Sequence, residues 1–219
     1  MKVFVLYWHP EPQSFNRAMF RTACEALSGA GHEVKTSDLH EMRFDPVSSR
    51  KSFVTVKDPN FFKQQIEEMH ATEMKGFSAE IESEMQKIEW CDLMIWQFPL
   101  WWFGLPAVVK GWVDRVFAKG RVYAGNQIYE TGVFRGKRAL LSLTTGGPEK
   151  VYRKGAFNWD MAGILRPIQR GILQFVGFEV MAPQIVYGAD RVTDEQRKQH
   201  LATYAMRLQS NAHESPIDV

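Results

Sequence analysis

The apolar residues of this chain gather into short runs that alternate with helical patterns, and this alternation constrains the fold more than any other feature. Residues 3–8 and 92–98 are almost wholly apolar, as is typical of strands that are buried on both faces. Further strands are predicted at residues 33–39, 138–145 and 179–187. Five strands that alternate with helices favour an α/β fold in which a doubly wound, five-stranded parallel sheet carries helices on both faces.

Capping signals mark the helices that separate these strands. Ser14 stands at the N-cap position of the first helix, and Gly29 and Gly31 follow its last periodic residues. Further helices are predicted from Ser78 to about Trp90, from Pro106 to about Ala118, at about 161–176, and at about 194–210 behind a capping box of Thr193 and Gln196. Residues 40–77 are predicted to be a long irregular insertion, and residues 211–219 a loose tail.

Composition narrows the class of protein. With 219 residues, 45% of them hydrophobic, residues 1–219 are predicted to form a single domain around one core. The net charge is +2 without a dense Lys/Arg block, which argues against nucleic acid as a partner. Neither a signal peptide nor an apolar run long enough for a transmembrane segment is recognised, so a cytoplasmic protein is expected. Cys24 and Cys91 are expected to be reduced thiols, and no metal-site spacing occurs.

Candidate ligand-binding residues cluster at three predicted strand ends. In an open parallel sheet, ligands bind beyond the carboxyl ends of the strands. The loops at these ends are residues 9–16, 99–106 and 144–148. Because the chain has neither a Walker A motif nor GxGxxG, P-loop chemistry and a Rossmann nicotinamide site are not expected. A nicotinamide would therefore have to dock on another bound group.

Each loop suits one part of a flavin nucleotide. The helix that begins at Ser14 offers free backbone N–H groups and a favourable dipole to a phosphate, and His9 and Asn16 add donors. The aromatic residues 101–103 offer a surface for the isoalloxazine ring, and Gly146 permits close approach of the backbone. Taken singly, these features also suit an ordinary N-cap, a packed core and a tight turn.

Several stretches together resemble the NAD(P)H:quinone oxidoreductase (DT-diaphorase) family in its short, bacterial type. The likeness runs from Val3 to about Pro216. The matching stretches are Ser14-Phe15-Asn16, Ser49-Arg50-Lys51, Phe98-Pro99-Leu100, Trp102-Phe103-Gly104, Lys110-Gly111-Trp112, Arg115-Val116-Phe117, Thr144-Thr145-Gly146-Gly147, Pro167-Ile168-Gln169 and Gly171-Ile172-Leu173. Joint occurrence makes them specific, although each alone is weak.

The resemblance implies a flavodoxin-like fold with noncovalent FAD, and NAD(P)H as co-substrate. It also implies a homodimer with shared active sites, in which a quinone or related acceptor receives a hydride by a ping-pong mechanism. The implied cofactor-binding residues are His9, Ser14, Phe15, Asn16, Pro99, Leu100, Trp101, Trp102, Phe103, Thr144, Thr145, Gly146, Gly147, Tyr152, Asp190 and Arg197. The implied substrate pocket is formed by Trp102, Phe103, Tyr123, Gly125, Gly146, Gly147 and Phe175, with Tyr123 and Phe175 coming from the partner subunit.

Two positions carry the implied catalytic roles. Tyr152 matches a tyrosine that hydrogen-bonds the flavin, and Asn158 stands where the animal enzymes have a histidine. Gly125 likewise replaces a second pocket tyrosine, which implies a more open pocket. Preference for NADH or NADPH, and for a quinone, nitroaromatic or azo acceptor, stays open.

Two other functions compete with a quinone reductase. Some relatives are ancillary regulatory subunits of potassium-efflux systems, and copurification with a membrane transporter would favour that alternative. A flavodoxin-type electron carrier is the other alternative, but carriers are usually acidic, whereas this chain has a pI near 8.5.

Overall fold

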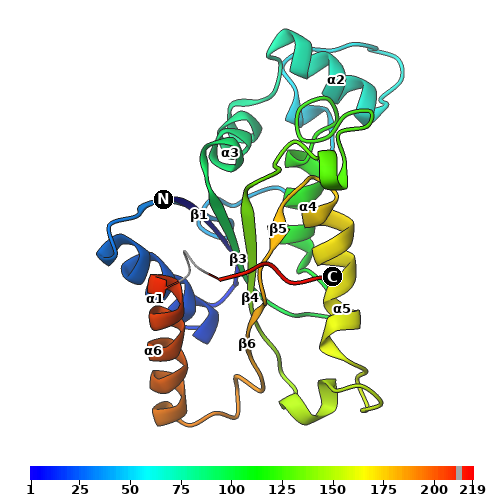
Figure 1. The fold of residues 1–219 in the computed structure, drawn as a ribbon. Helices are drawn as coiled ribbons and strands as arrows, with labels where there is room; N and C mark the ends of the chain where they lie inside the picture. Colours follow the sequence, from blue (N-terminus) through cyan, green and yellow to red (C-terminus); the bar gives the residue numbers. More distant parts are fainter. Residues whose placement is uncertain (211–213) are drawn as a thin grey trace.

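A parallel sheet stands at the centre of the computed structural model, which describes residues 1–210 and 214–219 (Figure 1). Its strand order is β2–β1–β3–β4–β5, and every pairing is parallel. The strands are β1 (Lys2–Tyr7), β2 (Glu33–Asp38), β3 (Leu93–Pro99), β4 (Arg138–Thr144) and β5 (Glu179–Val180). This is the flavodoxin-like order, in which the chain reverses its direction of winding between β1 and β3. The predicted fold class is confirmed.

Helices cover both faces of the sheet, as predicted. On one face lie α1 (Phe15–Gly29) and α6 (Asp194–Ser210), which pack against each other. On the other lie α3 (Ala79–Trp90), α4 (Ala107–Val116) and α5 (Met161–Ile168), which is continued by a π-helical segment, Gln169–Gln174. The N-caps predicted at Ser14 and Ser78 are confirmed, since each hydroxyl accepts a first-turn backbone N–H.

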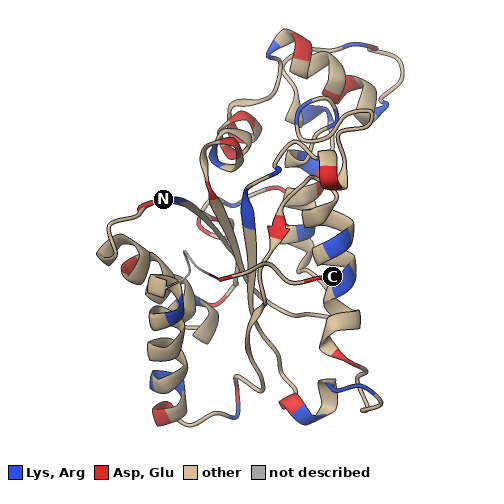
Figure 2. Cartoon of the chain, in the orientation of Figure 1, with Lys and Arg blue, Asp and Glu red and all other residues tan. Residues whose placement is uncertain are grey.

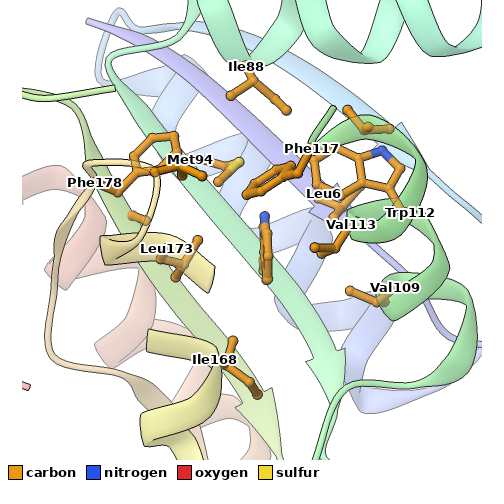
Figure 3. Close-up of a cluster of buried hydrophobic side chains, with 14 of the residues drawn as sticks. Leu6, Ile88, Met94, Val109, Trp112, Val113, Phe117, Ile168, Leu173 and Phe178 are labelled. Atoms are coloured by element: carbon orange, nitrogen blue, oxygen red, sulfur yellow. The ribbon is translucent and has the colours of Figure 1, made fainter. Parts of the chain in front are cut away.

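The core has its larger part under α3, α4 and α5, where Trp112, Phe117, Leu173 and Phe178 meet the central strands (Figure 3). Trp96 of β3 meets the edge of Trp112 with 5.9 Å between ring centroids. Each fully buried large apolar side chain contributes about 1.5–3 kcal/mol of transfer free energy, so this layer is the main source of stability.

The strand predicted at residues 179–187 is divided in the structure. It forms β5 and a separate β6 (Gln184–Val186), which both pair with β4. Pro183 lies between them, and a proline has no N–H to donate to a strand ladder.

The predicted loose tail is wrong for residues 214–219. The Ile217 N–H donates to the Val180 carbonyl at 2.8 Å, and Ile217 and Val219 pack against the core. Residues 211–213 of that prediction lie outside the described residues.

The insertion at residues 40–77 is more regular than predicted, because it contains α2 (Gln64–Met74). The buried positions of this helix are Glu67, Glu68 and Ala71. Glu67 accepts the backbone N–H groups of Lys57 and Asp58 at 2.8 and 3.1 Å. A helix that buries carboxylates in place of apolar side chains has no apolar stripe by which its sequence could reveal it.

Two motif residues fasten the insertion to α4. The guanidinium of Arg115 is buried, and it donates to Ser52 Oγ at 3.0 Å and to the Asp45 carbonyl at 2.5 Å. Gly111 lies so close to Pro46 that an added Cβ would stand 2.3 Å from the Pro46 carbonyl oxygen. The resemblance motifs around residues 110–117 are therefore packing motifs here.

Charged residues of both signs are interspersed on the helices and the insertion, while the middle of the sheet carries few (Figure 2). Cys24 and Cys91 are free thiols, as predicted. Among residues 1–210 and 214–219, none of the helices combines the length and apolar character needed to cross a bilayer.

Candidate active site

A cleft of about 820 Å³ lies at the carboxyl ends of β1, β3 and β4. These strands are adjacent, and the winding reverses between β1 and β3, which is where open α/β sheets place their ligands. The residues that line the cleft are His9, Glu11, Gln13, Ser14, Phe15, Asn16, Pro99, Leu100, Trp101, Trp102, Thr144, Thr145, Gly146, Ala189, Asp190 and Arg197. The structure thus brings together most of the predicted cofactor-binding residues.

The predicted cofactor-binding residues and the residues that line the cleft differ at six positions. The predicted residues Phe103, Gly147 and Tyr152 belong to the flanks of the same loops and do not line the cleft itself. Glu11, Gln13 and Ala189 line it but were not among the individually predicted cofactor-binding residues. Glu11 and Gln13 lie within the predicted loop 9–16, and Ala189 directly precedes the predicted Asp190.

One end of the cleft is the N-terminus of α1. The Ser14 hydroxyl accepts the Arg17 N–H at 3.1 Å, which leaves the N–H groups of Phe15 and Asn16 as the other first-turn donors. His9 Nδ1 accepts the Glu11 N–H at 3.0 Å, and burial lowers the pKa of His9. A neutral His9 in this tautomer carries its proton on Nε2. This end is a set of hydrogen-bond donors suited to an anionic group.

The mouth of the cleft is an aromatic turn at residues 101–104. Trp102 is 97% exposed, so burial contributes almost nothing to hold this side chain in place. Trp101 has its ring edge-on to Trp8, at 5.2 Å between centroids. An exposed indole beside a donor-lined cleft offers a flat apolar surface for a ring system to cover.

The loop after β4 forms a third wall. A Cβ added to Gly146 would find no atom within 4 Å, so the cleft is open to the backbone there. A Cβ on Gly147 would instead stand 3.1 Å from the Tyr152 hydroxyl oxygen. Thr145 Oγ1 donates to the Gly147 carbonyl at 2.7 Å and holds the loop in this shape.

The two predicted catalytic residues occupy neighbouring sites. Tyr152 packs on Tyr187, with 5.7 Å between ring centroids. Asn158 lies with Phe103, Phe157 and Trp159 around a second hollow of about 470 Å³. Among the described residues, no hydrogen bond joins the side chain of Tyr152 to that of Asn158.

Arg197 and Asp190 lie at another part of the cleft wall, where α6 begins. The Arg197 guanidinium lies 5.4 Å from the centre of the Phe15 ring, and its side chain is 32% exposed. This pair adds a further stretch of wall beside the α1 N-terminus. The added surface suits a ligand longer than one phosphate and its sugar.

Tyr123 and Phe175 lie in a different place. Their rings meet edge-on at 5.7 Å in a pocket of about 650 Å³ beside α2 and the end of α4. The aromatic turn precedes α4 and this pocket follows it, so the length of that helix, about 15 Å, separates them. Gly125 follows Tyr123 in the same loop, in the left-handed region with φ 51°. Within one chain, these three residues do not reach the cleft.

The residues of the cleft fit a flavin nucleotide. The α1 N-terminus and His9 suit its phosphate, the exposed aromatic turn suits its ring, and the open backbone at Gly146 permits close approach. Neither Cys24 nor Cys91 lines the cleft.

Comparison with known proteins agrees with this geometry. Residues 1–210 match the family model described as having the flavodoxin-like fold. The chain is 42% identical to mouse ribosyldihydronicotinamide dehydrogenase (quinone), over 99% of its own length and 94% of the mouse protein. It is 42% identical to guinea pig NAD(P)H dehydrogenase (quinone) 1, over 99% of its length and 79% of that protein.

A solved structure is also similar over nearly the whole chain. A Klebsiella pneumoniae protein described as a candidate quinone reductase is 37% identical, with a TM-score of 0.92, and the match covers 99% of this chain and 87% of the other. The three similarities extend over the fold and all three cleft loops. This chain therefore belongs to the NAD(P)H:quinone oxidoreductase family of flavodoxin-like enzymes.

Proposed function

We propose that the protein is an FAD-dependent NAD(P)H:quinone reductase. The observation that carries the proposal is one cleft with hydrogen-bond donors at the α1 N-terminus and an exposed aromatic turn at its mouth. The named relatives are quinone dehydrogenases, which supports the same activity here. The absence of a membrane-spanning helix among the described residues accords with an enzyme that works in the cytoplasm.

FAD is proposed in preference to FMN because of Asp190 and Arg197. Both line the cleft in addition to the donors that suit the first phosphate, and an adenosine would need such additional wall. The purified protein should be yellow, and mass spectrometry of the flavin released by heat identifies it. Release of FMN alone would contradict the role given to Asp190 and Arg197.

The chain's own residues have three tasks in this reaction. A flavin bound in the cleft supplies reversible hydride transfer between NAD(P)H and the acceptor. Trp102 and Phe103 provide an apolar surface that excludes water from the reacting rings. The Tyr152 hydroxyl, at the flank of the cleft, would donate a hydrogen bond to the flavin ring where negative charge develops. Asn158 is proposed to orient the loop that carries Tyr152, since the backbone N–H of Asn158 donates to the Val151 carbonyl at 2.8 Å.

The active site is proposed to be completed by a second copy of the chain. Tyr123 and Phe175 lie too far from the cleft to serve it within one chain, and they would serve the cleft of the partner. Phe157 and Trp159 are 93% and 78% exposed beside Phe103, which suits an interface. Light scattering should show a dimer, the commonest closed assembly. A fully active monomer would contradict the shared site.

One cleft that serves both substrates in turn predicts ping-pong kinetics. Initial rates with NADH, NADPH and dihydronicotinamide riboside as donors, each against menadione, should give parallel double-reciprocal lines. The riboside is included because a relative is named for it. Intersecting lines would show that donor and acceptor bind together at separate sites.

A further inference from the structure

A hydrogen-bonded network of buried polar side chains lies beneath the floor of the cleft. Its members come from α1, β3 and β4, and none is more than 5% exposed: Asn16, Gln97, Ser142 and Thr144. Gln97 is a polar residue in the middle of a strand that is otherwise fully buried and apolar. Polar groups at this depth must find partners within the protein, so the orientation of each one fixes that of the next.

The hydrogen bonds follow one direction. Ser142 Oγ donates to Gln97 Oε1 at 2.6 Å, and Gln97 Nε2 donates to Asn16 Oδ1 at 2.8 Å. Asn16 Nδ2 then donates to Thr144 Oγ1 at 2.8 Å. The network therefore ends at the hydroxyl of Thr144, a residue that lines the cleft.

A neighbouring thioether favours this direction. Gln97 Nε2 also points to Met19 Sδ at 3.8 Å, and a thioether can accept but cannot donate. The amide nitrogen of Gln97 therefore faces two acceptors, Asn16 Oδ1 and Met19 Sδ.

The opposite direction would require both amides to turn round. Gln97 would then donate to Ser142, and the buried Ser142 proton would lose its acceptor within this network. An unsatisfied buried donor is costly, whereas the observed direction gives Ser142 an acceptor in Gln97 Oε1. Ser142 therefore sets the direction of the network from its buried end.

The direction decides what Thr144 offers to a ligand. Its oxygen accepts from Asn16, and its own proton has no acceptor among the described residues. We propose that Gln97 and Ser142 are positioning residues, which turn the Thr144 hydroxyl into a hydrogen-bond donor toward an oxygen acceptor of the ligand in the cleft. The inference rests on the proposed function, in which that ligand is a flavin nucleotide.

A double-mutant cycle tests whether Ser142 acts through Thr144. The dissociation constants of FAD and FMN are measured by flavin fluorescence for the wild type, Ser142→Ala, Thr144→Val and the double variant. Each single change removes a hydroxyl and little volume, and each should weaken binding about 5–10-fold. In the Thr144→Val background, Ser142→Ala should weaken binding by no more than about twofold. Thr144→Ser should restore wild-type affinity.

A further variant separates positioning from packing. Ser37→Ala is the matched control, because Ser37 is a buried hydroxyl that donates to Glu84 Oε2 at 2.7 Å away from the cleft. It should lower the thermal stability of the flavin-free protein and leave flavin affinity unchanged.

The outcomes distinguish the two proposals. Equal weakening by Ser142→Ala in both backgrounds, with normal flavin binding by the wild type, would overturn the network and leave the proposed function intact. If the wild type bound neither FAD nor FMN, the proposed function itself would be overturned, and the donor role of Thr144 toward a flavin with it.

Discussion

Trp101 and Gly104 exchange two backbone hydrogen bonds, of 3.3 and 3.0 Å, and so close a four-residue turn at the mouth of the cleft. The two residues between them, Trp102 and Phe103, both have positive φ, at 50° and 58°. A turn of this kind normally holds Asn and Gly, because side chains with a bulky Cβ are strained there. Strained aromatics that are also exposed indicate a turn built for a ligand rather than for stability.

Replacing Trp102 by Asn should therefore stabilise the flavin-free protein. Relief of the left-handed strain should raise the free energy of unfolding by about 1 kcal/mol, since almost no burial is lost. Flavin affinity and menadione reduction should fall. Urea denaturation measures the first effect, with Trp101→Asn as the control: Trp101 is in the same turn but packs on Trp8, so that variant should lose stability. A Trp102→Asn protein less stable than the wild type would contradict the strain.

Gly146→Ala should separate binding from folding. The added methyl group meets open space in the flavin-free protein, so the free energy of unfolding should change by less than about 0.5 kcal/mol. The same methyl group occupies the cleft wall and should weaken flavin binding at least about tenfold, as titration followed by flavin fluorescence would show. Gly147→Ala is the comparison, because its methyl group meets Tyr152 and should disturb that ring instead. Unchanged flavin affinity in Gly146→Ala would place the ligand elsewhere.

Tyr152→Phe should slow flavin reduction at saturating NAD(P)H by about tenfold or more while the flavin stays bound, because one donor to developing charge is lost. The wild-type rate, followed by stopped flow from pH 5.5 to 8.5, should show no inflection near pH 6.5, since an amide at Asn158 does not titrate. Burial lowers the pKa of His9, so a His9 relay would show itself below that value. An unchanged rate in Tyr152→Phe would remove this residue from the mechanism.

Alkaline pH should destabilise the fold through the buried thiols. Burial raises the pKa of Cys91 from 9.0 to about 12, and that of Cys24 to about 11. The folded state therefore holds these protons above pH 9 while the unfolded state releases them, so the stability they contribute is lost as pH rises. Cys91→Ala should lose about 1.4 kcal/mol less per pH unit than the wild type between pH 9.5 and 11. Parallel pH curves from urea denaturation would contradict the raised pKa.

The strands and the cleft were accessible from sequence because their signals are local. Continuous apolar runs mark β1 and β3, and the ligand position follows from where parallel strands end. Helix α2 escaped prediction because its buried positions are carboxylates, whose partners are backbone N–H groups contributed by a loop. Such a pairing produces no periodic pattern in the sequence.

The network beneath the cleft was hidden for a related reason. Asn16 was predicted as a direct donor to the cofactor, but the structure shows that its side chain already serves Gln97 and Thr144. Its partners lie 81 and 128 positions away in the chain. Contacts between residues so far apart in the sequence depend on the register of the sheet. That register cannot be deduced from any single segment of the sequence.

The bond between Asn16 and Thr144 also bears on synthesis of the chain. The cleft is built from residues 9–16 near the N-terminus and from Ala189, Asp190 and Arg197 near the other end. A polypeptide still emerging from the ribosome cannot assemble these walls until residues 189–197 have left the exit tunnel, since folding of such long-range contacts waits for both partners. Binding of a flavin in this cleft would therefore follow synthesis of both walls.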